Sequence, residues 1–219
     1  MNKNRMINTS NSEFIYESLQ KEFPGAHCEL EFQTPFELLI ATILSAQCKD
    51  ERVNQVTAIL FSEANTPEGI IALGLKELEN KIRSLGLYRN KAKSIFLASQ
   101  ILVKEYAGKV PEDVELLRRL PGVGRKTANV VVSNAFGIPA LAVDTHVFRV
   151  AHRLGLAEGN TPEKVEEQLM KVFPRERWSS IHHLLIFLGR RICAARKPNC
   201  TECPVASVCK MFQGDIAEP

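Results

Sequence analysis

The sequence predicts an all-α protein, because helix start signals recur along the chain while strand signals are scarce. Three Thr-Pro pairs, at Thr34, Thr66 and Thr161, are each typical of an N-cap residue followed by the first residue of a helix. Glycines follow several apolar segments, where a glycine can end a helix in the left-handed conformation at little cost; these are Gly86, Gly108, Gly137 and Gly155. We expect roughly nine or ten helices joined by short connections.

The remaining helices follow from local patterns. Ser10 followed by Glu13 predicts a capping box at the start of the first helix. Apolar residues recur at helical spacing in 114–120 and again in 128–135, on either side of a turn that contains two glycines. Asp144 precedes another periodic segment and is a candidate N-cap. No linker of low complexity and no internal repeat divides the chain.

Composition narrows the class of protein. The chain has 219 residues, 45% of them apolar and 24% charged, which suits one large or two small globular domains. The apolar run Ile181 to Leu188 is too short to span a bilayer and is interrupted by two histidines. The N-terminus does not resemble a signal peptide, so we expect a cytoplasmic protein that does not associate with a membrane. A net charge of +3 does not by itself indicate a nucleic-acid partner.

Four of the six cysteines lie near the C-terminus, at Cys193, Cys200, Cys203 and Cys209, with six, two and five residues between them. Four closely spaced thiolates are typical of iron–sulfur ligation, so we favour a [4Fe-4S] cluster as cofactor. Zinc is the alternative, but a structural zinc site usually uses two short cysteine hooks, and only Cys200 and Cys203 form one. Disulfides are disfavoured because nothing indicates an oxidising compartment.

A second motif is the turn Pro121, Gly122, Val123, Gly124. Its glycines let the backbone approach a ligand closely, and the N–H groups that open the following helix form an anion site, with phosphate the expected anion. Arg125 and Lys126 follow directly, and Arg118 and Arg119 precede the turn. Such contacts hold a nucleic-acid backbone without reading its sequence. The alternative is that the glycines only end one helix and begin the next.

The segment of about 112–135 resembles the helix-hairpin-helix motif of a DNA glycosylase superfamily. The cysteine spacing resembles the cluster loop of its endonuclease III branch, and both motifs occur in the family's order over about residues 14–209. The resemblance implies two helical domains, 28–138 with the hairpin, and 1–27 plus 139–219 with the cluster loop. It also implies a monomer that binds double-stranded DNA containing damaged bases or abasic sites.

The activity that the resemblance implies is that of a bifunctional DNA N-glycosylase and apurinic/apyrimidinic (AP) lyase of base excision repair. Such an enzyme removes oxidised pyrimidines and cleaves 3′ to the abasic site by Schiff-base β-elimination. Its attacking amine must be neutral, and a position in the first turn of a helix beside Arg125 disfavours the charge on Lys126. The resemblance assigns the catalytic lysine to Lys126 and the catalytic carboxylate to Asp144. From the residues alone, Lys126 could be a phosphate contact and Asp144 an N-cap.

The resemblance also assigns Gln47 to the gap left by a flipped base and Leu87 to a wedge among the bases of the opposite strand. Without it, Gln47 reads as a polar residue at a helix end and Leu87 as a core residue. Arg196 and Lys197, between the first two cluster cysteines, are expected to contact phosphates from a loop that the cluster orders. The alternative is that the cluster has only a structural role. Cys48, after Gln47, departs from the family's pattern.

Two other functions stay open. An adenine-specific mismatch glycosylase shares the cluster spacing, but that branch lacks the lysine found here at Lys126. A non-catalytic iron–sulfur protein that binds DNA is the alternative from another class of function.

Overall fold

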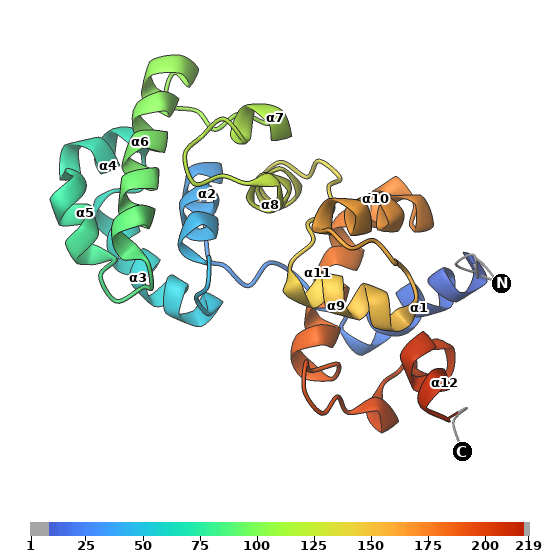
Figure 1. Ribbon diagram of the computed structural model, residues 1–219. Coiled ribbons are helices and arrows are strands. Elements are labelled where there is room, and N and C mark those ends of the chain that lie inside the picture. Colours follow the sequence, from blue (N-terminus) through green and yellow to red (C-terminus); the bar gives the residue numbers. More distant parts are fainter. Residues whose placement is uncertain (1–8, 217–219) are drawn as a thin grey trace. The chain divides into compact units, whose positions relative to one another are not determined.

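The computed structural model describes residues 9–216, which form twelve α-helices, three 3₁₀ helices and no strand (Figure 1). The all-α prediction is therefore confirmed for this part of the chain. The chain divides into two compact units, one made of residues 28–138 and the other of the residues up to 27 together with those from 139 onward. Each unit has its own buried core. No helix in the described range is both long enough and apolar enough to cross a membrane.

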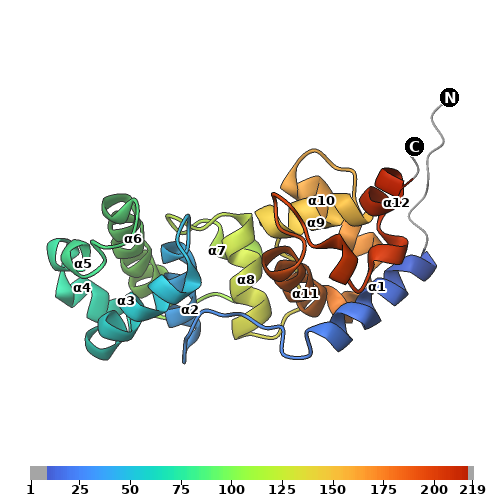
Figure 2. The same cartoon turned by 90° about the horizontal axis from the view of Figure 1, so that it is seen from below.

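The unit of residues 28–138 is built around α2, whose residues from Phe36 to Leu44 are all buried. This helix contacts α3, α6 and α8, and it lies between α6 and α8 (Figures 1 and 2). The buried residues of α6 recur at helical spacing, from Lys91 through Ile95 to Leu102, so one face of that helix packs on the core. The helices of this unit are α2 (Pro35–Leu44), α3 (Asp50–Glu63), α4 (Pro67–Leu73), α5 (Leu75–Lys81), α6 (Tyr88–Tyr106), α7 (Val114–Leu117) and α8 (Arg125–Ala135).

The other unit is built around the packing of α9 against α11, with α1 on α11 and with α10 and α12 on α9. Its core includes the buried positions Leu19, Val147, Val150, Leu185 and Leu188. A segment without regular secondary structure, 139–144, leads into α9. The helices of this unit are α1 (Thr9–Glu22), α9 (Thr145–Leu154), α10 (Pro162–Val172), η1 (Arg175–Arg177), α11 (Trp178–Arg191), η2 (Cys200–Glu202), η3 (Ala206–Val208) and α12 (Lys210–Ile216).

The threonine caps occur as predicted. The Oγ1 atoms of Thr34, Thr66 and Thr161 accept hydrogen bonds from the backbone N–H three residues on, at 3.2, 3.0 and 3.3 Å. In each case the following proline occupies the start of the helix. Helix α1 already includes Ser10, and the proposed capping by its side chain lies outside the described side chains.

Two expectations were wrong in detail. The structure has more helices than expected, in part because α5 and α12 have only seven residues each, too few turns for a periodic pattern to reveal them. Gly108, Gly137 and Gly155 do adopt positive φ angles, but Gly86 does not. The left-handed residue after α5 is instead Leu87, with φ 58°.

Candidate functional site

The turn between α7 and α8 requires a glycine at its second position. Gly122 has φ 80°, and a Cβ atom there would lie 2.8 Å from Cβ of Ser94. Gly124, by contrast, is the extended N-cap of α8, with φ −89° and ψ 177°, and a Cβ atom on it would meet no other atom within 4 Å. Buried Val123 fixes the turn to the core between the two glycines. The space beside Gly124 is thus open to a ligand.

Helix α8 begins without a side-chain cap and has no acidic residue in its first turn. Its N-terminal N–H groups and its dipole therefore favour an anion. Arg125 and Lys126 occupy this first turn, and both side chains are exposed. The Lys126 amine is therefore accessible to a ligand at the start of α8.

Cys28 lies in the same unit within electrostatic reach of Lys126. Burial raises the pKa of its thiol, while the N–H of Leu30 and the charge of Lys126 act in the opposite direction. The net effect is a raised pKa, so Cys28 is expected to be a protonated thiol at neutral pH.

Asp144 caps α9 as the sequence predicts. Its Oδ1 accepts hydrogen bonds from the N–H groups of His146 and Val147, both at 2.8 Å. The carboxylate is half-buried, and its Oδ2 makes no hydrogen bond among the described residues of its own unit. Capping thus uses one oxygen and leaves the second for other chemistry. Asp144 belongs to the unit with α9 and α11, whereas Lys126 belongs to the unit with α2 and α8.

Three candidate residues have strained backbones. Four non-glycine residues in the range 9–216 have positive φ, and Gln47 (57°), Leu87 (58°) and Lys197 (50°) are three of them. This conformation costs an ordinary residue about 1–2 kcal/mol. Strain of this kind clusters at functional sites, where the surrounding structure enforces it.

Both Gln47 and Leu87 point away from the core. Leu87 is 57% exposed, so the alternative that it is a core residue is wrong. Gln47 lies in the exposed turn that follows α2, and its side chain is solvent-accessible. A large apolar side chain that is both strained and exposed contributes little to the folded core, which favours an interaction role.

The four C-terminal cysteines line one pocket. None of the six cysteines forms a disulfide. Burial raises the pKa of the Cys203 thiol, and the nearby thiols of Cys193, Cys209 and Cys200 raise it further. Within residues 9–216, no three His, Cys, Asp or Glu side chains meet closely enough to hold a single metal ion. Four cysteine thiols around one pocket fit the Cys₄ ligation of an iron–sulfur cluster.

Two arginines on α9 fix the start of the cysteine loop. Nη1 of Arg153 donates to Ala194 O at 2.7 Å and to Cys193 Sγ at 3.3 Å. Nη2 of Arg149 donates to Gly189 O at 2.9 Å and to Cys193 O at 3.1 Å. Sequence reasoning missed this pair, although its four-residue spacing places both side chains on one helical face. The predicted phosphate contacts Arg196 and Lys197 follow in the same loop, and both are exposed.

Comparison with known proteins places the chain in a family. Residues 40–175 match the family model described as HhH-GPD superfamily base excision DNA repair protein. The chain is 51% identical to Endonuclease III of Bacillus subtilis (strain 168) over 209 residues, which cover 95% of each protein. The chain belongs to the endonuclease III family. Endonuclease III of Escherichia coli (strain K12) is 48% identical over 196 residues, covering 90% of this chain and 93% of that protein.

Solved endonuclease III structures share the fold. A non-covalent Endonuclease III–DNA complex matches with a TM-score of 0.92 and 50% identity, covering 97% of this chain and 100% of the other. The superfamily match ends at residue 175, before the cysteine loop. The full-length match to the Bacillus endonuclease III shows that the endonuclease III relationship extends over nearly the whole chain.

Proposed function

We propose that the chain is a bifunctional DNA N-glycosylase and AP lyase of base excision repair that acts on oxidised pyrimidines in duplex DNA. The observation that carries the proposal is the exposed amine of Lys126 in the first turn of α8, directly after a glycine turn that is open to a ligand at Gly124. A lysine in that place combines an attacking group with a backbone site for phosphate.

DNA binding begins with the phosphate backbone. The uncapped start of α8 and the Arg125 cation bind a phosphate beside Gly124, and Arg196 and Lys197 bind others. Because a base inside a duplex is inaccessible, the damaged nucleotide flips out. Gln47 fills the vacated space, and Leu87 wedges between bases of the opposite strand, where its exposed side chain becomes buried.

The chemistry uses two groups. The Lys126 amine attacks C1′ of the sugar, the glycosidic bond breaks, and the base departs with a proton. The C1′–O4′ bond then breaks, O4′ stays on C4′ and takes up a proton from solvent, and a Schiff base is left between C1′ and Lys126. Removal of a C2′ proton expels the 3′ phosphate, and water then hydrolyses the Schiff base and releases the lysine. Asp144 supplies the carboxylate that stabilises the cationic sugar and accepts a proton, through the Oδ2 that capping leaves available.

The cysteines Cys193, Cys200, Cys203 and Cys209 hold a [4Fe-4S] cluster. When bound, it cross-links the loop through four thiolates and so fixes the positions of Arg196 and Lys197. Metal analysis of anaerobically purified protein tests this assignment. Four iron atoms per chain with broad absorbance in the blue are expected, and stoichiometric zinc without iron would refute it.

The activity is tested on duplex DNA with one oxidised pyrimidine beside an undamaged control duplex. The expected products are the free damaged base and a strand cleaved 3′ to the site, from the damaged duplex alone. Binding without either product favours the non-catalytic iron–sulfur protein. Release of adenine from a mismatch, without strand cleavage, favours the mismatch glycosylase. We also propose that the protein is cytoplasmic and that it acts as a monomer. Sedimentation of the free protein tests the monomeric state.

A further inference from the structure

We propose that Lys91 is a positioning residue for base excision, because it holds the turn that presents Gln47. Lys91 lies on α6 and is only 5% exposed, which is unusual for a lysine. Its Nζ donates to the carbonyl oxygen of Leu44 at 2.9 Å and to Sγ of Cys48 at 3.3 Å. The inference rests on the proposed function, since it deepens the role assigned to Gln47.

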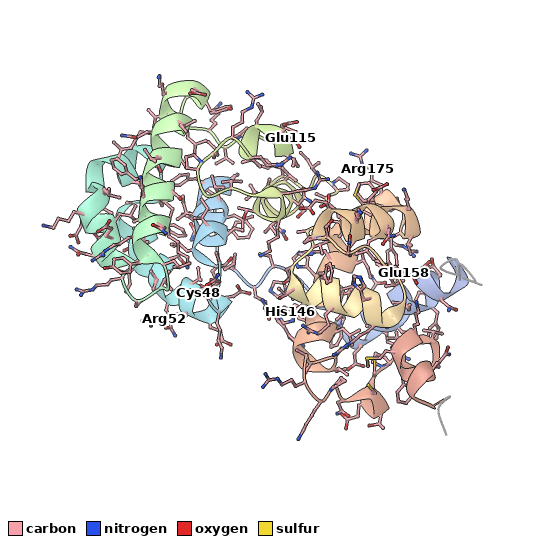
Figure 3. The ribbon with its side chains drawn as sticks, in the orientation of Figure 1. Cys48, Arg52, Glu115, His146, Glu158 and Arg175 are labelled. Carbon is pink, nitrogen blue, oxygen red and sulfur yellow. The ribbon has the colours of Figure 1, made fainter. Side chains whose placement is uncertain are left out.

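The two acceptors lie on either side of Gln47 in the sequence. Leu44 is the last residue of α2, and its carbonyl is one of those that a helix C-terminus leaves without an intrahelical partner. A lysine at this end satisfies that carbonyl and complements the helix dipole. Cys48 follows Gln47 directly, and Figure 3 shows it near the end of α2. One side chain from another helix therefore bridges both ends of the turn.

The turn needs such a support because it contains no glycine. Gln47 adopts the left-handed conformation with φ 57°. The turn is closed by Cys48 N donating to Ser45 O at 3.0 Å, and the Ser45 hydroxyl donates back to Thr42 O at 2.9 Å. The first of these bonds spans Gln47, but neither attaches the turn to a neighbouring helix. The bonds from Lys91 do, and they come from a buried atom whose position the core of the unit fixes.

Sequence reasoning could have noticed Lys91. It stands in the apolar stripe of α6, four residues before buried Ile95 and next to buried Ala92. A lysine in such a stripe must find polar partners within the fold, because a buried donor without an acceptor is costly. Cys48 is also accounted for, since its thiol is one of these acceptors.

A double-mutant cycle tests the inference. Lys91→Met keeps the apolar stem and removes the donor, and it is expected to slow release of the damaged base from duplex DNA on the order of tenfold. In a Gln47→Ala background the same change is expected to matter less than about threefold, because the turn no longer presents the side chain that Lys91 positions. Lys93→Met, an exposed lysine on the same helix, is the matched control and should leave the rate within about twofold of the wild type.

The effects must be measured well below the unfolding temperature of each variant. Equal losses from Lys91→Met in both backgrounds would overturn the inference, because a general loss of structure acts independently of Gln47. Should Lys91→Met not fold, Cys48→Ala enters the same cycle, with a loss of about threefold expected only when Gln47 is present. Additive effects of Cys48→Ala and Gln47→Ala in that cycle would also overturn the inference. A wild-type protein that releases no base would instead defeat the proposed function.

Discussion

At the scale of single residues, the two glycines of the hairpin turn differ in whether the fold requires them. Gly122 is required by the fold, because its φ of 80° and the nearness of Ser94 both exclude a side chain. Gly124 is not, since its backbone is extended and the space around its Cα is open. We therefore expect the glycine at position 124 to serve the binding of a ligand and not the fold.

This contrast gives a paired prediction. Gly122→Ala should destabilise the protein by at least about 1 kcal/mol, because alanine is strained at positive φ. Gly124→Ala should cost less than about 1 kcal/mol, yet weaken duplex binding about tenfold by obstructing the phosphate site. Calorimetric unfolding and a DNA titration on both variants separate the effects. Unimpaired binding by Gly124→Ala would show that no phosphate approaches this glycine.

A second prediction concerns His183 in the core of the other unit. Burial, together with the neighbouring charges of His182, His27 and Arg190, lowers the pKa of its imidazole to about 3. The folded state therefore keeps this ring neutral, while the unfolded chain binds a proton below its ordinary pKa of 6.5. The stability that the neutral ring contributes is present above pH 6.5 and is lost progressively as the pH falls toward 3.

The loss attributable to His183 between pH 7 and pH 5 is about 2 kcal/mol. His183→Gln, which does not titrate, should show a correspondingly shallower decrease over this range. Denaturant unfolding followed by fluorescence is a suitable measurement, because the single tryptophan, Trp178, lies in the same unit. Parallel pH dependences of wild type and variant would contradict the assignment.

At the scale of elements, the helix boundaries show what a sequence can predict. The caps at Thr34, Thr66, Thr161 and Asp144 were predictable, because capping depends on residues within three positions of one another. The left-handed conformation of Leu87 was not predictable, because the adjacent Gly86 would adopt it at lower cost and only the tertiary structure decides between the two residues. Strain of this kind is visible only in the folded protein.

Leu87 lies at the start of α6 with its side chain exposed, so its role can be tested by substitution. Leu87→Gly relieves the backbone strain and removes little buried surface, so stability should stay within about 1 kcal/mol of the wild type. Base release should nevertheless fall at least about tenfold, since the wedge is gone. Leu97→Ala, which alters another exposed leucine of α6, should leave base release unchanged. Wild-type base release by Leu87→Gly would remove Leu87 from the DNA-binding surface.

At the scale of the whole molecule, the sequence motifs indicated the family, which the pattern of helices alone did not. The cysteine spacing and the glycine turn together indicated the endonuclease III family, which the full-length similarity confirms. The supporting contacts could not be predicted, because they join residues far apart in the sequence. Lys91 with Leu44, and Arg153 with Ala194, are examples. The cysteine spacing identifies the loop from the sequence alone. The hydrogen bonds from the arginines of α9, which hold the backbone of that loop, are visible only in the structure.

Borohydride trapping tests whether Lys126 attacks the sugar. Reduction of the Schiff base should link the wild-type protein covalently to duplex DNA that contains one abasic site. Lys126→Ala should bind the same duplex but give no adduct, whereas Lys104→Ala, which alters an exposed lysine of α6, should be trapped like the wild type. A full yield of covalent adduct from Lys126→Ala would show that another residue attacks the sugar.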